Sequence, residues 1–316
     1  MKTAIGLDLG GTFIKAGLVT DEGTVRARVE LPTRAEDNDR DVVLDQMRTA
    51  VDRLREHAPP SGLAGIGIGT PGVVDSRGVV YESPNLPDWD NLPLRDIFSS
   101  EYRVPVVVEN DVNSIAWGEF LFGAGRGSRS MVCLTLGTGI GGGVVSNGRL
   151  LRGAEFSAIE IGHTTIDYRG PRCKCGNIGC IEAFAGKDAI VARATAAISQ
   201  GRKTILSDLC GGDTSRMTPK MLYEAAGRGD AVAREVWEDV GVCLGALCTT
   251  LVNLFNPEKI VIGGGISGAG DFLFQPIRRT VAERAFRNMS AMVSIVPAGL
   301  GTDTGIISGA ALVFQQ

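Results

Sequence analysis

Residues 3–19 read TAIGLDLGGTFIKAGLV and hold the pattern that decides the fold. Two short apolar runs, Thr3–Asp8 and Phe13–Val19, flank a glycine pair, which predicts two adjacent β-strands joined by a tight turn. A third β-rich run, Thr24–Glu30, follows a second turn at Asp21–Gly23. The chain is therefore expected to open with a three-stranded meander.

Beyond this meander, apolar runs of strand length alternate with stretches of helical periodicity. The expected strands are Leu63–Gly69, Val104–Glu109, Met131–Leu136, Gly142–Ser146 and Lys259–Ile262. The expected helices are Arg40–His57, Val112–Phe122, Lys187–Ser199, Pro219–Ala226, Ala231–Phe255 and Asp303–Phe314. The ordering begins at Thr3 and again at Met131, so the sequence predicts a duplicated α/β unit with a cleft between its halves.

Composition narrows the class of protein. Glycine supplies 43 of the 316 residues, yet no G-X-Y period is present and hydrophobic residues reach 44%, which excludes collagen and a disordered chain. The length corresponds to about two domains of roughly 150 residues each. The net charge of −4 argues against a general nucleic-acid-binding protein.

The sequence predicts a cytoplasmic protein with no membrane partner. The N-terminus shows no signal-peptide pattern. The two longest uncharged stretches, Ser130–Gly148 and Val240–Pro257, fall just short of the roughly 20 apolar residues of a spanning helix. We expect a glycine-rich hairpin and a buried helix there. Seven cysteines without an export signal favour free thiols or a metal site over disulfides.

Three glycine clusters each follow an expected strand: Gly10-Gly11, Gly137–Gly143 and Gly263–Gly265. Turns without Cβ atoms let backbone N–H groups approach phosphate oxygens, although a plain hairpin turn explains each cluster equally well. The Walker A and protein-kinase motifs do not occur. The run GTGIGGG lies between two strands and not before a helix, which argues against a Rossmann dinucleotide site.

A possible metal site follows the second glycine cluster. His163, Cys173, Cys175 and Cys180 lie close together in the sequence, and three thiolates with one imidazole suit a closed, structural zinc site. The alternative is a set of free side chains in a glycine-rich loop. The other cysteines lie on apolar runs and are expected in the core, namely Cys133, Cys210, Cys243 and Cys248.

Two glutamates flank the metal-binding residues. Glu160 precedes His163 by three residues, and Glu182 follows Cys180 by two. A bound zinc ion would therefore hold two glutamate-bearing segments together. Glu182 could instead be a first-turn glutamate that the helix dipole favours.

Further polar side chains lie near an expected strand end. Asn110 and Asp111 follow Val104–Glu109, and Asn85 lies in a loop flanked by prolines. Carboxylates and amides match the paired donors and acceptors of a polyol. Asp111 could instead cap the following helix.

Together these motifs resemble the ROK family (repressors, open reading frames, sugar kinases), and within it the bacterial glucokinase-like enzymes. The resemblance covers essentially the whole chain. The matching pieces, in family order, are DLGGTFIKAGLV, GIGTPGVVD, SPNLPDW, VVVENDVNSIAWGE, LTLGTGIGGGVVSNG, EIGH, CKCGNIGCIE and IVIGGGIS. The resemblance implies an actin-like ATPase fold, in which two ribonuclease-H-like α/β domains enclose a central cleft. We expect these domains at 1–113 plus 300–316, and at 114–299.

The resemblance also implies an activity: ATP-dependent phosphorylation of a hexose, most directly at the 6-hydroxyl of glucose. ATP, Mg²⁺ and a structural Zn²⁺ are the implied cofactors, and a homodimer or homotetramer is the implied assembly. Kinases for N-acetylmannosamine, N-acetylglucosamine or fructose are the alternatives within the family. A sugar-responsive repressor is disfavoured, because such proteins carry a DNA-binding region before the loop that begins here at Asp8.

Individual roles follow from the same resemblance. Asp111 resembles the family's catalytic base. The residues that resemble its sugar contacts are Asn85, Asn110, Asp111, Glu160, His163 and Glu182. Gly10, Gly11 and Thr12 match the family's first phosphate loop, and Lys15 lies on the next strand. Thr138 and Gly139 match the second phosphate loop. Gly264 and Gly265 match the motif that binds the adenosine. Asp8 is expected to orient Mg²⁺ through water. The zinc set matches His163, Cys173, Cys175 and Cys180.

One residue departs from the family pattern. Ile159 stands where the family usually carries glycine, directly beside Glu160. This departure bears on which sugar the protein prefers more than on which reaction it catalyses.

Overall fold

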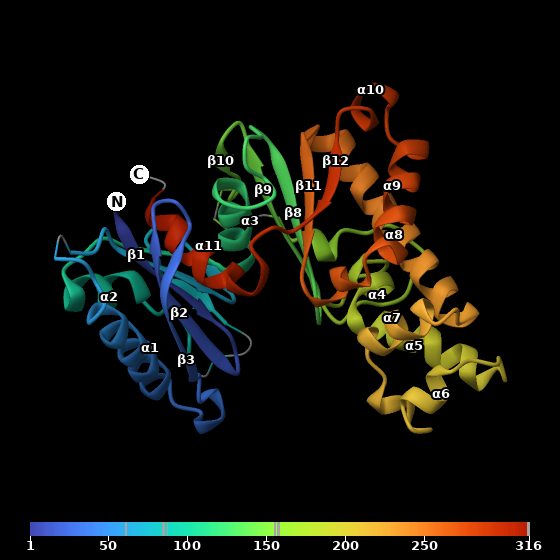
Figure 1. The fold of residues 1–316 in the computed structure, drawn as a ribbon, viewed down its shortest axis with the longest axis horizontal. Coiled ribbons are helices and arrows are strands. Elements are labelled where there is room, and N and C mark those ends of the chain that lie inside the picture. Colours follow the sequence, from blue (N-terminus) through green and yellow to red (C-terminus); the bar gives the residue numbers. More distant parts are fainter. Residues whose placement is uncertain (61, 84–85, 87, 155, 157–158, 315–316) are drawn as a thin grey trace. The chain divides into compact units, whose positions relative to one another are not determined.

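The computed structural model describes residues 1–60, 62–83, 86, 88–154, 156 and 159–314. The chain forms two compact units. Unit 1 holds Met1–Ser128, Gly143–Ile159 and Ala298–Gln316, and unit 2 holds Arg129–Gly142 and Glu160–Pro297. Each unit combines strands with helices (Figure 1).

The observed division differs from the expected boundary near residue 113. Helix α3 (Asp111–Leu121) belongs to unit 1, because it packs against the C-terminal helix α11 (Thr304–Val313). The indole Nε1 of Trp117 on α3 donates a hydrogen bond of 3.1 Å to the carbonyl oxygen of Ala311 on α11. The segment Gly143–Ile159 also belongs to unit 1, so the chain passes between the units more often than expected.

The sheet of unit 1 has the strand order β3-β2-β1-β4-β7. Its strands are β1 (Thr3–Leu9), β2 (Phe13–Thr20), β3 (Val25–Pro32), β4 (Ile66–Thr70) and β7 (Val106–Asn110). The first three form the expected antiparallel meander, whereas β1, β4 and β7 are parallel. The carboxyl ends of the parallel strands therefore meet at one edge, where Asp8, Gly69 and Glu109 share a register row.

The helices of unit 1 cover both faces of this sheet. Alternate residues of β1 explain the layering: Ile5, Leu7 and Leu9 share a core cluster with α1 (Arg40–Arg55) and α2 (Leu94–Tyr102). The opposite face packs against α11, at glycines that allow a close approach. A Cβ on Gly6 would lie 2.0 Å from the carbonyl oxygen of Ile306. A two-stranded ribbon, β5 (Val73–Val74) with β6 (Val80–Glu82), completes the unit.

The second sheet has the order β10-β9-β8-β11-β12. Its strands are β8 (Met131–Leu136), β9 (Ile140–Ser146), β10 (Arg149–Leu150), β11 (Lys259–Gly263) and β12 (Ser294–Pro297). Strands β8, β11 and β12 are parallel, and β9 and β10 are antiparallel to each other. In both sheets the first strand in sequence lies in the middle, with its two successors on one side. This repeated order confirms the predicted duplicated ribonuclease-H-like fold.

The helices of unit 2 are α4 (Glu182–Ala185), α5 (Lys187–Ser199), α6 (Leu206–Leu209), α7 (Pro219–Gly227), α8 (Ala231–Phe255), α9 (Asp271–Arg284) and α10 (Arg287–Ser290). Among the described residues, α8 alone is long and apolar enough to cross a membrane by length and composition. It packs along α9, where a Cβ on Gly241 would lie 2.3 Å from Cγ of Pro276. This packing is that of a core helix. The sequence patterns did not predict α9, which contains Pro276.

Candidate active site and metal centre

Asp111 lies at the corner where β7 ends and α3 begins. The helix cap is its neighbour Asn110, whose side-chain oxygen accepts hydrogen bonds from the N–H groups of Val112 at 3.0 Å and Asn113 at 3.2 Å. The amide nitrogen of Asn110 donates to the carbonyl oxygen of Gly72 at 3.1 Å. Asp111 is the first helical residue, and its Oδ1 accepts from the Val112 N–H at 2.9 Å. The capping role weighed for Asp111 therefore falls mainly to Asn110.

The electrostatic surroundings of Asp111 favour its protonated form. Burial raises the pKa of Asp111 to about 6, with a further increase from the negative charge of Asp8, while the Val112 N–H acts in the opposite direction. Burial also raises the pKa of Asp8, against the effect of Lys15, which lies opposite Asp8 on β2. A carboxylate with a pKa near 6 is well suited to accept a proton at neutral pH.

The first glycine loop joins β1 to β2, and its backbone is open. The Gly10 N–H donates to the carbonyl oxygen of Phe13 at 3.0 Å, while Gly11 and Thr12 are exposed. Asp8 lies at the start of this loop and packs against Gly305 in the first turn of α11. A Cβ on Gly305 would lie 2.0 Å from Oδ2 of Asp8, so only glycine leaves space for the carboxylate.

The second glycine loop joins β8 to β9, and Glu182 holds it. Within the loop, the Gly137 N–H donates to the carbonyl oxygen of Gly139 at 2.9 Å, and Thr138 is exposed. Oε2 of Glu182, the first residue of α4, accepts a hydrogen bond of 2.9 Å from the Ile140 N–H. Glu182 is thus a first-turn residue, as the alternative interpretation had it, and also a support for this loop.

The third glycine cluster follows β11. Gly264 has a φ of +85°, and a Cβ there would lie 2.3 Å from the carbonyl oxygen of Leu136, so this position requires glycine. Beside it lies a cavity of about 280 Å³, lined by Pro219, Lys220, Tyr223, Trp237, Gly265, Ile266, Gly268 and Ala269. Within the part of the chain that the structure describes, the buried Nε1–H of Trp237 has no hydrogen-bond acceptor. The cavity lining thus includes the exposed ring of Tyr223, whereas Trp237 is almost completely buried.

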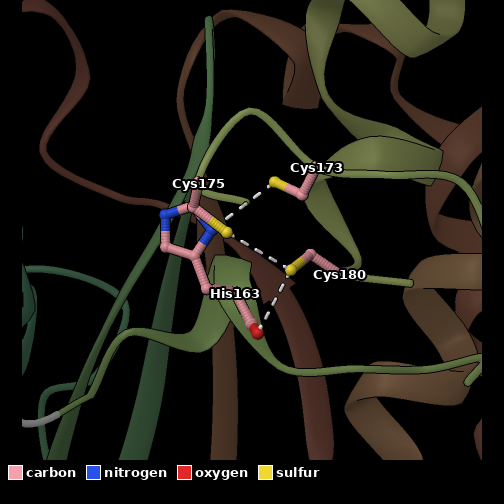
Figure 2. A group of neighbouring side chains, drawn as sticks. All are labelled: His163, Cys173, Cys175 and Cys180. Atoms are coloured by element: carbon pink, nitrogen blue, oxygen red, sulfur yellow. Dashed lines mark hydrogen bonds between the residues drawn. The ribbon is translucent and has the colours of Figure 1, made fainter. Parts of the chain in front are cut away.

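Four side chains of unit 2 form a group that could hold a metal ion (Figure 2). The ligand atoms of His163, Cys173, Cys175 and Cys180 all lie within 4.8 Å of one another. The Sγ atoms of Cys175 and Cys180 are 3.7 Å apart, and Sγ of Cys173 is 3.8 Å from Nδ1 of His163. A tetrahedral zinc ion with bonds of about 2.3 Å separates its ligands by about 3.8 Å. The spacing therefore fits zinc, with Nδ1 as the ligand atom of His163.

The segment between the glycine loop and the metal group carries an unusual backbone. Ile159 has a φ of +78°, a conformation that side chains branched at Cβ rarely adopt. The resemblance described above implies a glycine at this position. Glu160 follows and is exposed at the start of the 3₁₀ turn Ile161–His163. Asn85 lies outside the described residues.

The expected site residues fall into two groups. Unit 1 brings together Asp8, Lys15, Asn110 and Asp111 with the first glycine loop; unit 2 brings together Glu182, the second loop and the metal group. No sequence pattern indicated Glu109, Arg152 or Trp237 as residues of these regions. The one sequence signal for Glu109 is that a charged residue stands within an otherwise apolar strand, Val104–Glu109.

Two ribonuclease-H-like units with glycine loops at the ends of their strands define a protein of the actin-like ATPase fold. The sequence matches the ROK family over residues 4–316, and the chain belongs to this family.

Relatives in this family include enzymes and repressors. A glucokinase of Thermotoga maritima is 38% identical over 316 residues, covering 99% of this chain and 97% of that protein. The repressor Mlc of Escherichia coli is 34% identical over 274 residues, covering 86% of this chain and 66% of that protein. Among solved structures, a ROK family glucokinase from Streptomyces griseus in complex with glucose and AMPPNP has a TM-score of 0.82 and 34% identity, covering 99% of this chain and 100% of that chain.

Proposed function

We propose that this chain is an ATP-dependent hexokinase, and specifically a glucokinase that transfers the γ-phosphate of ATP to the 6-hydroxyl of D-glucose. The observation that carries the proposal is Asp111, a buried carboxylate with a pKa of about 6 at the carboxyl end of a parallel strand, near Asp8. Glucokinases 35–38% identical over nearly the whole chain, and the bound glucose and AMPPNP of the Streptomyces griseus enzyme, support it.

In this proposal Asp111 is the general base. It accepts the proton of the 6-hydroxyl as that oxygen bonds to the γ-phosphorus and the bond from phosphorus to the β–γ bridging oxygen breaks, releasing ADP. Oδ1 accepts from the Val112 N–H, which leaves Oδ2 for the sugar hydroxyl. Phosphoryl transfer depends mainly on positioning and charge neutralisation, so the glycine loops contribute through their open N–H groups.

Asp8 fits the role of a magnesium-orienting residue. Its carboxylate is a hard oxygen donor of the kind that Mg²⁺ prefers, and a nearby cation would offset the burial that raises its pKa. When bound, Mg²⁺ supplies neutralisation of phosphate charge. Lys15, opposite Asp8 on β2, adds a second positive charge near the first loop.

We assign the adenine ring to the cavity beside Gly265. Tyr223 lines this cavity and is 42% exposed, so it offers aromatic surface to the ring. Thr138 and Gly139 of the second loop would receive the phosphates.

The metal group is proposed to hold a structural Zn²⁺. With Nδ1 of His163 directed at the thiols, Nε2 remains free for a sugar hydroxyl. The side chain of Asn110 lies beside Asp111, and Glu160 is exposed. We propose that these side chains, with Glu182, bind the sugar. We also propose a homodimer or homotetramer that works in the carbohydrate metabolism of the cytoplasm.

The experiment is a coupled ADP-release assay with ATP and glucose, mannose, fructose, N-acetylglucosamine or N-acetylmannosamine. The proposal expects the highest kcat/KM with glucose. A clear preference for an N-acetylated sugar would replace glucokinase by an amino-sugar kinase. Sugar binding without ADP release from any of the five would contradict the kinase function and favour a sugar sensor such as the repressor relatives.

A further inference from the structure

Glu109 is a buried charge at the corner that carries Asp111. Its side chain is only 4% exposed. Oε1 accepts hydrogen bonds from the N–H of Asn110 at 3.1 Å and from Nδ2 of Asn113 at 3.2 Å, and Oε2 accepts one of 2.5 Å from Nε of Arg152. One carboxylate thus joins the end of β7, the first turn of α3 and an arginine 43 residues further along the chain.

Arg152 contacts two partners at once. It follows β10, whose neighbour Leu151 donates its N–H to the carbonyl oxygen of Val144 at 2.8 Å and so holds the chain against β9. Nε of the guanidinium binds Glu109, and its Cζ lies over the ring of Phe156, 5.8 Å from the ring centroid. The arginine side chain is 21% exposed, so solvent screens this pair only weakly.

We infer that Arg152 is a positioning residue for phosphoryl transfer. Through Glu109 it fixes the corner that presents Asp111. The inference rests on the proposed function, because it takes Asp111 as the base. A planar guanidinium can offer a hydrogen-bonding edge and a stacking face together, whereas a lysine ammonium cannot.

The chemistry of the pair explains why its loss should affect catalysis. Without Arg152, the buried Glu109 carboxylate loses the positive charge that donates a hydrogen bond to its Oε2. The carboxylate would then take up a proton or draw in water, and either change alters its bonds to Asn110 and Asn113. Displacing a reacting group by about 1 Å can reduce the rate by about 100-fold.

The experiment compares purified full-length R152K, R152M, E109Q and the E109Q/R152M double variant with the wild-type protein. For each, kcat, KM for glucose, KM for ATP and the melting temperature are measured. R152M is expected to lower kcat between about 10- and 100-fold and to raise KM for glucose, with KM for ATP changed less than about twofold. R152K keeps the positive charge but lacks the planar guanidinium, so its kcat should lie between those of R152M and the wild type.

Two comparisons separate positioning from plain stability. If Arg152 acts through Glu109, the double variant loses no more activity than R152M alone, because the second change removes a partner already lost. The matched control is R202M, which breaks the exposed Arg202–Glu235 pair of 2.6 Å in unit 2 and should leave kcat unchanged.

The outcomes distinguish this inference from the proposed function. Wild-type ADP release with undiminished kcat in R152M would overturn the inference alone, as would single-variant losses that multiply in the double variant. If R152M does not fold, R152K provides the test: the inference then expects a lower kcat than that of the wild type with KM for ATP nearly unchanged. A wild-type protein that releases no ADP with any hexose would overturn the proposed function, and the inference with it.

Discussion

The carboxylate of Glu182 accepts a hydrogen bond of 2.9 Å from the backbone N–H of Ile140. The other oxygen of the same carboxylate lies 4.0 Å from Sγ of Cys173. Gly139 permits this approach, because a Cβ there would lie 2.4 Å from Oε2 of Glu182. Glu182 therefore connects the metal group to the glycine loop that we assign to phosphate.

This connection predicts that zinc supports both substrates. Purified protein should contain about one zinc ion per chain, and Cys175→Ser should lose it, because a four-ligand structural site needs all its ligands. KM should then rise for glucose and for ATP, each by about tenfold, as expected when groups around a metal lose their orientation. Elemental analysis and steady-state kinetics provide the measurements.

The control for the zinc prediction is Cys243→Ser, since Cys243 lies on α8 outside the metal group. It should keep both zinc and activity. Protein purified without zinc, or a zinc-free variant with unchanged KM values, would contradict this role.

Gly264→Ala should damage the fold, whereas the same change at the next residue should not. Gly264 combines a φ of +85° with a 2.3 Å approach to the Leu136 carbonyl, and no atom lies within 4 Å of a Cβ built on Gly265. We expect Gly264→Ala to lower the free energy of unfolding by at least about 2 kcal/mol in urea titrations. Gly265→Ala should preserve stability and raise only KM for ATP. Equal stability of the two variants would show that the backbone at Gly264 tolerates a side chain.

The sequence predicted the longer strands and several helices, because their residues form apolar runs or follow a helical period, but it did not predict β5, β6, β10 and β12. The apolar run Thr3–Asp8 and the helical spacing in α1 report burial directly, and both elements form where expected. Helix α9 escaped prediction, since Pro276 interrupts its pattern and only packing against Gly241 explains the proline. The boundary near residue 113 was misplaced because contacts between α3 and α11 join segments about 190 residues apart.

The candidate site was predictable only where its residues are close in sequence. The metal group spans 163–180, and its spacing alone indicated its ligands. The pair of Glu109 and Arg152 joins two segments that meet only after folding, so no local pattern could reveal it. The contact of Glu182 with Ile140 is of the same kind, since it spans 42 residues.

Ile159→Gly should stabilise the protein. A residue branched at Cβ with a φ of +78° carries a strain of about 1–3 kcal/mol, which glycine removes at a cost of about 0.5–1 kcal/mol in chain entropy. We expect a net gain of about 1 kcal/mol in the free energy of unfolding. Ile159→Ala is the control, because it removes the branched side chain and retains a Cβ. A glycine variant less stable than the alanine variant would contradict the claim that the backbone at Ile159 is strained.

The activity should depend on pH through Asp111. Burial raises the pKa of this carboxyl to about 6, and a general base must be unprotonated. Because this pKa is that of the free protein, kcat/KM for glucose should fall about tenfold per pH unit below pH 6 and level off above it. A kcat/KM that stays constant from pH 7 down to pH 5 would show that Asp111 keeps an ordinary pKa or takes no part in proton transfer.

The measurement that tests the central claim most directly is kcat of Asp111→Asn with glucose and ATP at pH 7. Asparagine keeps an oxygen for the Val112 N–H but cannot accept the sugar proton, so kcat should fall by about 10²- to 10⁴-fold. The variant should remain folded, because removing a buried carboxylate whose pKa is raised from 3.8 to about 6 contributes up to about 3 kcal/mol of stability at this pH. A folded variant with nearly the wild-type kcat would contradict the assignment of Asp111 as the base.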